Sequence, residues 1–595
     1  MATPERKPYR GLSRKLVIAF DIGTTFSGAS FAILDPDEIP KIQGVTRFPA
    51  QAKTGGDCKI PSIIYYDQEG NVQAVGAETA DEAFLERAED ENYIKVEWFK
   101  LHLRPKGMNT SDVQDSDLPP LPPNKTALRV FADFLKYLYE NTIKYIQELG
   151  PLYKPGSEFW NSVKDNIELI LSHPNGWEGS QQSIMRRATV LAGLVTEESS
   201  LTALHFVTEG EASLHFCVMS GKASTLGNSG GLIVVDAGGG TIDISAYYSV
   251  GQESFEEVAR TRCLLQGSVY VSRRAEAHLK QKLANSKYSS NDDVKQITQV
   301  FDKTTKLVFR DRDSPAFIRF GTAKDRDPSV DIRNGQLKLA GNVVEEFFEP
   351  SLKQSVQAIK DIQEESSRAL STVLLVGGFA ANEWLFMNLQ RELAPLNMTL
   401  SRPDGHVNKA VADGALSFYL DHFVSVRVSK YTYGIECATQ YIPSNPEHNR
   451  RSHSIVVRPS GKRVVPGSFS RILAKGTRIH EEKEFSRSYY QESGSIDMFR
   501  SVIIDVMSYR GNLTNPEWID TEPHMYTTLC TVVADASKAV KPNSRGKGSS
   551  YYTVDFKMIL LLGLTEMKAQ LSWMEDGVEK RSPAKVVYDD MSMAR

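Results

Sequence analysis

The sequence predicts an α/β protein in two parts: a first part built around two similar hairpins, followed by a β-rich part. Two observations lead to this prediction. Two aspartate–glycine segments, Asp21–Thr25 and Asp236–Asp243, each follow an apolar strand and lie about two hundred residues apart. After about residue 422, the pattern changes to short alternating apolar segments that Gly, Pro and Asn separate.

The first hairpin starts with Lys15–Phe20, an apolar and β-branched run typical of a buried strand, and returns through Ser27–Leu34. Gly23 lets the backbone turn tightly and approach an anion closely. Thr24 and Thr25 bring hydroxyl groups and backbone N–H donors to the same place. This turn is therefore a candidate phosphate-binding loop.

The second hairpin repeats this design. Gly231–Asp236 is the expected strand and Thr241–Tyr247 the returning one, and the turn between them holds three glycines, Gly238, Gly239 and Gly240. Two such turns in one chain predict a cleft that holds the phosphates of a nucleotide from two sides.

Both hairpins carry an aspartate at the end of their first strand, Asp21 and Asp236. Mg²⁺ keeps several waters and takes only one or two carboxylates beside phosphates, so these two residues are candidate metal ligands. A third strand, Ser371–Val376, ends in Gly377 and Gly378 before a helix start. Bare backbone at this turn would let a ribose or adenine lie against it.

The segments DIGTTFSG, VVDAGGGTIDIS and LLVGGF occur in this order and together resemble the ATPase domain of the 70 kDa heat-shock chaperones, within the actin, sugar-kinase and chaperone ATPase superfamily. The resemblance covers residues 15–422. It implies a two-lobed actin-like domain with duplicated ribonuclease H-like cores, lobes of about 15–228 and 229–422, and binding of ATP or ADP with Mg²⁺. The residues that it assigns to the nucleotide are Gly23, Thr24, Thr25, Phe26, Gly238, Gly239, Gly240, Thr241, Lys306, Gly377, Gly378, Phe379 and Asn408.

The resemblance also implies catalytic roles for ATP hydrolysis. Lys100, in Trp98–Leu103, matches the family's segment with a lysine that reaches the terminal phosphate, although by itself it would be expected on a solvated surface. Glu209 matches the family's catalytic glutamate. Either Asp236 or Glu209 would orient the attacking water, and Asp243 is a candidate for ordering it.

Several positions depart from the family. Gly210 replaces a proline after the glutamate, and Gln266–Val271 stands where the family has a double glycine and acidic residues. Lys306 is only a loose match to the basic residue that packs on the base, and Asn408 replaces an aspartate near the ribose. The phosphate contacts are therefore expected to be kept and the adenosine contacts altered.

Composition agrees with a large protein that binds neither nucleic acid nor membrane. The 595 residues include 70 Lys and Arg against 74 Asp and Glu, a formal net charge of -4. The five cysteines are scattered and form no C-x-x-C pair, so no zinc site or disulfide framework is expected. No secretory signal or apolar run of spanning length is found, which favours a cytoplasmic or nuclear protein.

The second part, residues 429–595, is expected to be a β-rich domain. Tyr433–Glu436 and Ile472–Thr477 resemble the opening strands of the chaperones' peptide-binding domain. No length remains before Arg595 for a helical lid, and Asp421–Val428 lacks the family's acidic, leucine-rich linker. The chain thus resembles the divergent, lid-less branch of the family. The other segments expected to be strands are Ser454–Arg458, Arg471–Ala474, Ser501–Asp505, Thr528–Val533 and Val554–Ile559.

Three functions remain open at this point. The first is a chaperone-like, stress-response ATPase, in which slow hydrolysis controls binding of protein clients or a regulatory partner by the C-terminal domain. The second is a nucleotide-sensing scaffold with little hydrolysis. The third is a small-molecule kinase of the sugar-kinase type, against which the β-rich second part argues. The client and the oligomeric state are not predicted.

Overall fold

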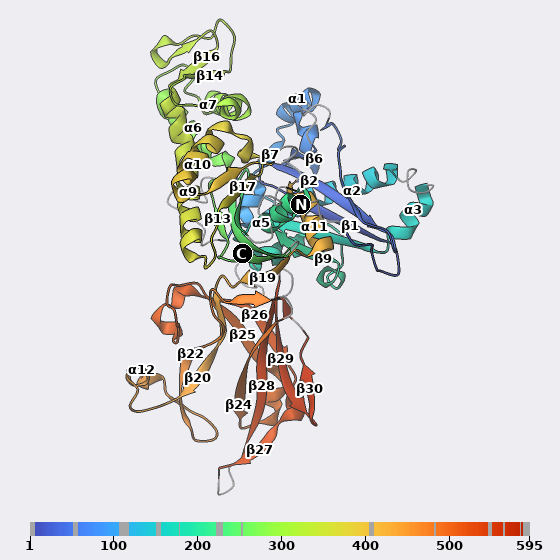
Figure 1. Ribbon diagram of the computed structural model, residues 1–595, viewed down its shortest axis with the longest axis vertical. Coiled ribbons are helices and arrows are strands. Elements are labelled where there is room, and N and C mark those ends of the chain that lie inside the picture. The colour runs from blue at the N-terminus through green and yellow to red at the C-terminus, as the bar shows by residue number, and fades with distance from the viewer. Residues whose placement is uncertain are drawn as a thin grey trace. The chain divides into compact units, whose positions relative to one another are not determined.

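The computed structural model describes residues 6–51, 58–105, 118–149, 156–177, 179–221, 230–251, 254–403, 410–480, 483–545, 550–562, 566–583 and 585–586. The chain forms two compact units, and the main break lies between Val424 and Ser425. We call them the N-terminal unit and the C-terminal unit (Figure 1). Mixed α/β structure in the first and a β-rich second unit confirm the predicted fold class.

The first large sheet of the N-terminal unit has the order β3-β2-β1-β8-β9, and β4 also pairs with β2. Strand β1 runs antiparallel to β2 and parallel to β8, so the first hairpin lies at the centre of the sheet. The strands are β1 (Lys15–Ile22), β2 (Phe26–Leu34), β3 (Lys41–Gly44), β4 (Ile60–Pro61), β8 (Ile167–His173) and β9 (Leu204–Thr208).

The second large sheet repeats this arrangement. Within this unit it runs β18-β17-β10-β11-β12, with β13 beside β11, and β10 is antiparallel to β11 and parallel to β17. The two hairpins therefore occupy equivalent places in two similar sheets. The strands are β10 (Gly231–Ala237), β11 (Ile242–Gly251), β12 (Ser254–Glu257), β13 (Arg262–Leu264), β17 (Thr372–Val376) and β18 (Thr399–Ser401).

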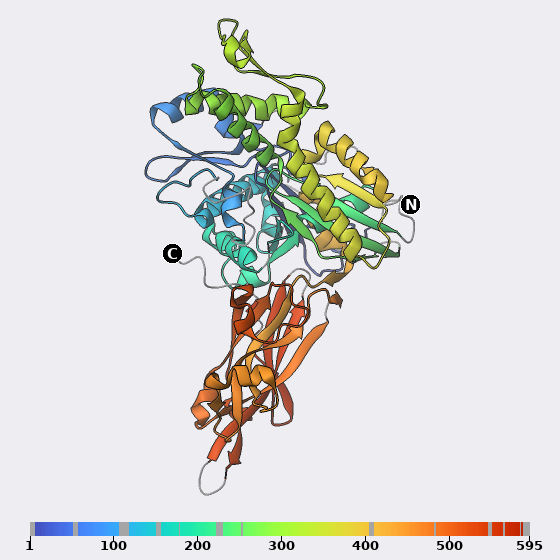
Figure 2. The ribbon, with the colours of Figure 1, turned by 90° about the vertical axis from the view of Figure 1, so that its left-hand side faces the viewer.

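Helices pack on these sheets (Figures 1 and 2). Each sheet forms an apolar core of its own together with helices. Phe131 and Phe134 of α2 join the core of the first sheet, and Phe348 of α9 joins that of the second. The helices are α1 (Glu82–Asp90), α2 (Ala127–Leu149), α3 (Gly156–Val163), α4 (Ser180–Leu191), α5 (Glu209–Met219), α6 (Ser268–Lys282), α7 (Asn291–Val300), α8 (Lys306–Val308), α9 (Gly341–Glu365), α10 (Glu383–Leu393) and α11 (Ala410–Asp421).

Two small sheets complete the N-terminal unit, with the orders β6-β5-β7 and β14-β16-β15. Their strands are β5 (Ile63–Tyr66), β6 (Val72–Val75), β7 (Ile94–Glu97), β14 (Ala316–Arg319), β15 (Ile332–Arg333) and β16 (Gln336–Leu339). Among the helices of the described ranges, none combines the length and hydrophobicity of a bilayer-spanning segment.

The C-terminal unit contains two sheets, β21-β22-β20-β25-β26 and β24-β28-β29-β30, with one shared apolar core that includes Val506, Val532 and Met558. The segment at Ser454 was expected to be a strand, but its pairing begins only at Val456. The elements are β19 (Val424–Val428), β20 (Thr432–Gln440), α12 (Pro446–Arg450), β21 (Val456–Val457), β22 (Arg463–Leu473), β23 (Arg478–His480), β24 (Glu484–Ser493), β25 (Val502–Tyr509), β26 (Tyr526–Ala534), β27 (Lys541–Ser544), β28 (Ser550–Leu562), β29 (Met567–Glu575), β30 (Val578–Arg581) and β31 (Lys585–Val586).

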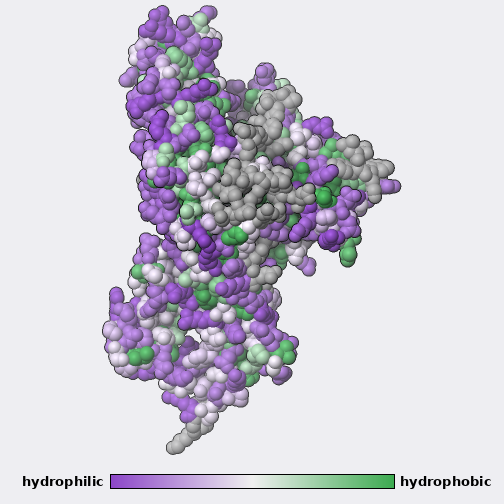
Figure 3. Space-filling model, viewed as in Figure 1, coloured by the Kyte–Doolittle hydropathy of each residue, from purple (hydrophilic) through white to green (hydrophobic). Residues whose placement is uncertain are grey.

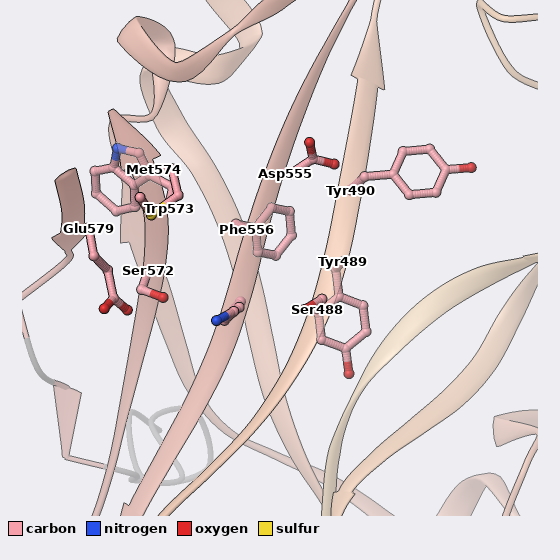
Figure 4. A pocket seen from close by; sticks show the side chains of 10 residues that line it. Ser488, Tyr489, Tyr490, Asp555, Phe556, Ser572, Trp573, Met574 and Glu579 are labelled. Atoms are coloured by element: carbon pink, nitrogen blue, oxygen red, sulfur yellow. The ribbon is translucent and has the colours of Figure 1, made fainter. Parts of the chain in front are cut away.

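A groove of about 410 Å³ lies on strands β24, β28, β29 and β30 of the C-terminal unit. Aromatic side chains and Met574 line it together with several polar groups (Figure 4). Elsewhere, on the face seen in Figure 3, hydrophobic residues are scattered among hydrophilic ones.

Candidate functional site

The two hairpins meet. An ideal Cβ atom on Gly239 would lie 2.3 Å from Oγ1 of Thr25, and one on Gly240 would lie 2.3 Å from Oγ1 of Thr24. Only glycine permits this approach, because real Cβ contacts are never so short. Thr24 and Thr241 are both buried here, so the two phosphate loops expected from the sequence share one place.

Backbone hydrogen bonds hold each turn in shape. Ser62, just after β4, donates from its hydroxyl to the carbonyl of Gly23 at 2.8 Å and from its N–H to that of Thr25 at 2.8 Å. The N–H groups of Ser268 and Val269 donate to the carbonyls of Gly238 and Gly239 at 3.1 and 2.9 Å. The N–H groups at the start of α6 therefore support the second hairpin.

Four buried carboxylates surround the junction: Asp21, Glu209, Asp236 and Asp243. Asp236 and Asp243 are direct cross-strand partners in β10 and β11. The negative charges of Asp21, Asp236 and Asp243 all raise the pKa of Glu209, so the four groups act on one another electrostatically. The sequence-predicted catalytic and metal-binding carboxylates are thus brought together.

Asp236 is held in a defined orientation. Ser213 of α5 donates from its hydroxyl to Oδ2 at 2.7 Å, and Oδ1 faces Gly377, where an ideal Cβ would lie 2.4 Å away. Burial, assisted by Asp243 and Asp21, raises the pKa of Asp236 to about 7. A carboxylate with such a pKa can accept a proton near neutral pH.

Lys100 lies within the cluster and not on a solvated surface. Its side chain is 3% exposed, and its Nζ lies 2.5 Å from Oε1 of Glu209 and 5.6 Å from the ring centroid of Trp177. Burial raises the pKa of Glu209 more than the charge of Lys100 lowers it. The family resemblance, and not the local sequence, was the signal that pointed to Lys100.

Asp243 accepts a hydrogen bond from Asn175, which follows β8 of the first sheet. The N–H of Asn175 donates to its Oδ1 at 2.7 Å, while its buried Oδ2 makes no hydrogen bond of normal geometry with any residue the structure describes. The amide of Asn175 bonds Ser245 at 2.9 Å and accepts from the N–H of Gly210 at 3.3 Å. An ideal Cβ on Gly210 would lie 2.4 Å from Oγ of Ser245, so this packing explains why glycine stands in place of proline.

Sequence reasoning missed Lys59. Its Nζ lies 2.6 Å from Oδ2 of Asp21, and its side chain is 17% exposed. Burial lowers the pKa of Lys59, but Asp21, Asp236 and Glu209 raise it by a larger total. Lys59 directly precedes the segment Ile60–Tyr65 that resembles a family strand, and that adjacency was the available signal.

Of the residues expected to contact adenosine, Gly377 lies against Asp236, whereas Lys306 and Phe379 have partners other than the four carboxylates. Nζ of Lys306 bonds Asp302, the hydroxyl of Ser272 at 3.2 Å and the carbonyl of Ser268 at 3.3 Å, where α6 begins. Phe379 follows the Gly377–Gly378 turn, but its ring is 5% exposed and packs against Phe348.

Phe26, a further predicted contact, is 50% exposed. Asn408 falls outside the described residues. Within the described ranges, no three side chains are grouped as a metal-binding cluster. Mg²⁺ takes only one or two carboxylates in such sites, and waters and phosphate oxygens are its other ligands. Asp21 and Asp236 therefore still suit Mg²⁺.

Comparison with known proteins finds relatives among the 70 kDa heat-shock proteins. No family model matches the chain. It is 24% identical to Heat shock 70 kDa protein 12A of Homo sapiens over 554 residues, which span 80% of this chain and 79% of that protein. It is 23% identical to the Mus musculus protein of the same name over equal shares, and 23% identical to Heat shock 70 kDa protein 12B of Homo sapiens over 82% of this chain and 80% of that one. This similarity runs through both units and supports the resemblance of the chain to the 70 kDa heat-shock proteins, as a divergent relative.

Proposed function

We propose that the N-terminal unit binds ATP or ADP with the phosphates at the junction of the two hairpins, and that it hydrolyses ATP slowly. The observation that carries this proposal is the contact of Thr24 and Thr25 with Gly240 and Gly239. Two turns rich in N–H and hydroxyl donors, one from each sheet, are suited to binding anions.

Phosphate recognition rests on the donors of this junction. The hydroxyl groups of Thr24, Thr25 and Thr241 and the N–H groups of both turns would bind the β and γ oxygens. Lys100 carries a compact positive charge next to them and would neutralise the charge that develops on the terminal phosphate.

Hydrolysis requires a water aligned with the terminal phosphate. Asp236, held by Ser213, and Glu209, held by Lys100, are the two residues that would orient it and accept its proton. The buried, unpaired Oδ2 of Asp243 is a further acceptor for a water at this place. Asp236 would hold Mg²⁺, which supplies charge neutralisation at the phosphates, and Asp21 would join it only where the ion displaced Lys59.

We further propose that the C-terminal unit binds a client or regulatory protein, and that the protein acts in the cytoplasm or nucleus. The groove on β24 and β28–β30 offers the exposed side chains of Tyr490 and Met574 to apolar side chains of a partner (Figure 4). Nucleotide would control the binding of the partner only if the nucleotide binds one of two states of the chain more tightly than the other.

The test uses the full chain. We expect ATP and ADP to bind in calorimetric titration, and phosphate release of the order of one turnover per minute or less, far below the 1 to 100 per second of typical kinases. No binding of either nucleotide by the folded chain would refute the proposal. Turnover that rises by orders of magnitude with a small hydroxylated acceptor would instead identify a kinase.

A nucleotide-sensing scaffold is the second candidate. The interaction of Lys59 with Asp21 favours it, because a proposed metal ligand is already paired in the ligand-free chain. The scaffold predicts that ATP binds and changes the affinity for the partner without measurable phosphate release.

A further inference from the structure

Lys59 is fixed at the first hairpin by the fold. It directly precedes β4, whose Ile60 and Pro61 pair with Ser27 and Phe26 of β2. Its stem passes over Gly28, where an ideal Cβ would lie 3.1 Å from Cγ of Lys59. The ammonium group is therefore held inside the junction and is not at the end of a freely moving surface chain.

The ammonium group retains unused hydrogen-bonding capacity. A lysine carries three N–H donors. Among the residues that the structure describes, only Oδ2 of Asp21 accepts a hydrogen bond from Lys59, although Asp236 and Glu209 attract its charge. Two donors of a largely buried cation thus remain for a ligand with acceptor oxygens.

The same contact occupies Asp21. Its Oδ2 accepts from Lys59 at 2.6 Å, and its Oδ1 accepts from the hydroxyl of Ser172 at 3.2 Å. A divalent cation that bound Asp21 directly would have to displace one of these donors and would be repelled by the ammonium group. Lys59 thus supplies positive charge at the position where a metal ion would otherwise supply it.

We propose that Lys59 is a phosphate-binding residue that acts as a built-in cation, so that the chain binds nucleoside di- and triphosphates with little dependence on Mg²⁺. The inference rests on the proposed function and adds the charge that pairs with the nucleotide. Lys100 is paired with Glu209 in the same way, so two lysines on two different carboxylates supply positive charge at the junction.

The experiment measures ADP binding by calorimetry in the full chain, with Mg²⁺ in excess and with EDTA in excess, at constant ionic strength. The variants are Lys59→Met, which keeps the length of the stem, and Lys59→Arg, which keeps the charge. Lys353→Met is the matched control, because Lys353 is 70% exposed and pairs only with Glu349 in the described chain. Circular dichroism and thermal melting confirm that each variant is folded.

For the wild-type chain, we expect the dissociation constant for ADP to change less than about threefold between the two media. Lys59→Met should bind ADP about tenfold or more weakly in EDTA and recover when Mg²⁺ is added, whereas Lys59→Arg and Lys353→Met should behave like the wild type. Wild-type binding that disappears in EDTA overturns the inference and leaves the proposed function standing. Equal binding by Lys59→Met and wild type in EDTA also overturns it, and no ADP binding in either medium overturns both. The wild-type measurement decides the matter even if Lys59→Met does not fold.

Discussion

Thr25 and Gly239 come from different sheets of the N-terminal unit, yet they are so close that a methyl group on residue 239 would overlap the side chain of Thr25. This contact joins the two hairpins at the place where we propose that phosphates bind. It also makes the glycines of the second turn essential for a reason separate from the turn conformation.

Gly239→Ala should separate the hairpins and weaken ADP binding about tenfold or more, because Thr25 is short and β-branched and has little room to move. Calorimetric titration of the full chain measures this change. Gly251→Ala is the control, since an ideal Cβ there has no neighbour within 4 Å and no effect on binding is expected. Unchanged affinity in Gly239→Ala would mean that phosphates do not bind at this junction.

Asp236→Asn should leave nucleotide binding measurable but reduce hydrolysis at least about tenfold, because the amide keeps the contact with Ser213 and cannot accept a proton. Single-turnover phosphate release separates this effect from binding. Asp361→Asn, at an exposed position on α9, should have no effect. If Asp236→Asn hydrolyses ATP at the wild-type rate, Asp236 takes no part in the reaction.

Gly210→Ala tests the departure at the catalytic glutamate. The added methyl group would meet Ser245 at 2.4 Å and the amide of Asn175 at 2.9 Å, so Asn175 should shift and release Asp243. We expect a loss of about 1 to 3 kcal/mol in the free energy of unfolding and a severalfold slower hydrolysis. Urea denaturation and phosphate release measure the two effects, and wild-type values in both would show that this packing is unimportant.

Glu168, at the start of β8, connects three elements at the far end of β1 from Asp21. Lys15, His205 and Tyr419 all donate to it. Burial raises the pKa of Glu168, but these three donors lower it by more, to about 2.

Because the folded-state pKa is depressed, the stability that this carboxylate contributes is complete above about pH 4.5 and is lost as the pH falls towards 2. Glu168→Gln should therefore cost about 1 to 2 kcal/mol at pH 7 and almost nothing near pH 2. Denaturant titrations across this pH range test the prediction, with the half-exposed Glu349→Gln as control. A difference between wild type and variant that does not depend on pH would contradict it.

The sequence predicted the hairpins well because their signals are local. Apolar, β-branched runs that end in Asp and Gly require nothing beyond the neighbouring residues, and the ends of β1, β2, β10 and β11 differ from the expected ones by at most four residues. Val456–Val457 shows the limit of such patterns. It pairs only where β22 lies opposite, so the longer strand expected from Ser454 does not form.

The site was predicted less completely, because part of it depends on tertiary contacts. A lone lysine before a strand has no characteristic spacing, and only the pairing of β4 with β2 brings Lys59 to Asp21. For Phe379, a motif gave the position in the chain but not the direction of its ring, which the apolar core around Phe348 determines.

The passage of the Lys59 stem over Gly28 has an evolutionary consequence. A methyl group at residue 28 would already press on the stem, and a larger side chain would push the ammonium group out of place. Gly28 lies in β2 and Lys59 just before β4, yet a substitution at one position constrains the other. Lineages that retain the lysine should therefore also retain a minimal side chain at residue 28, and lineages that lose the lysine should be free to vary there.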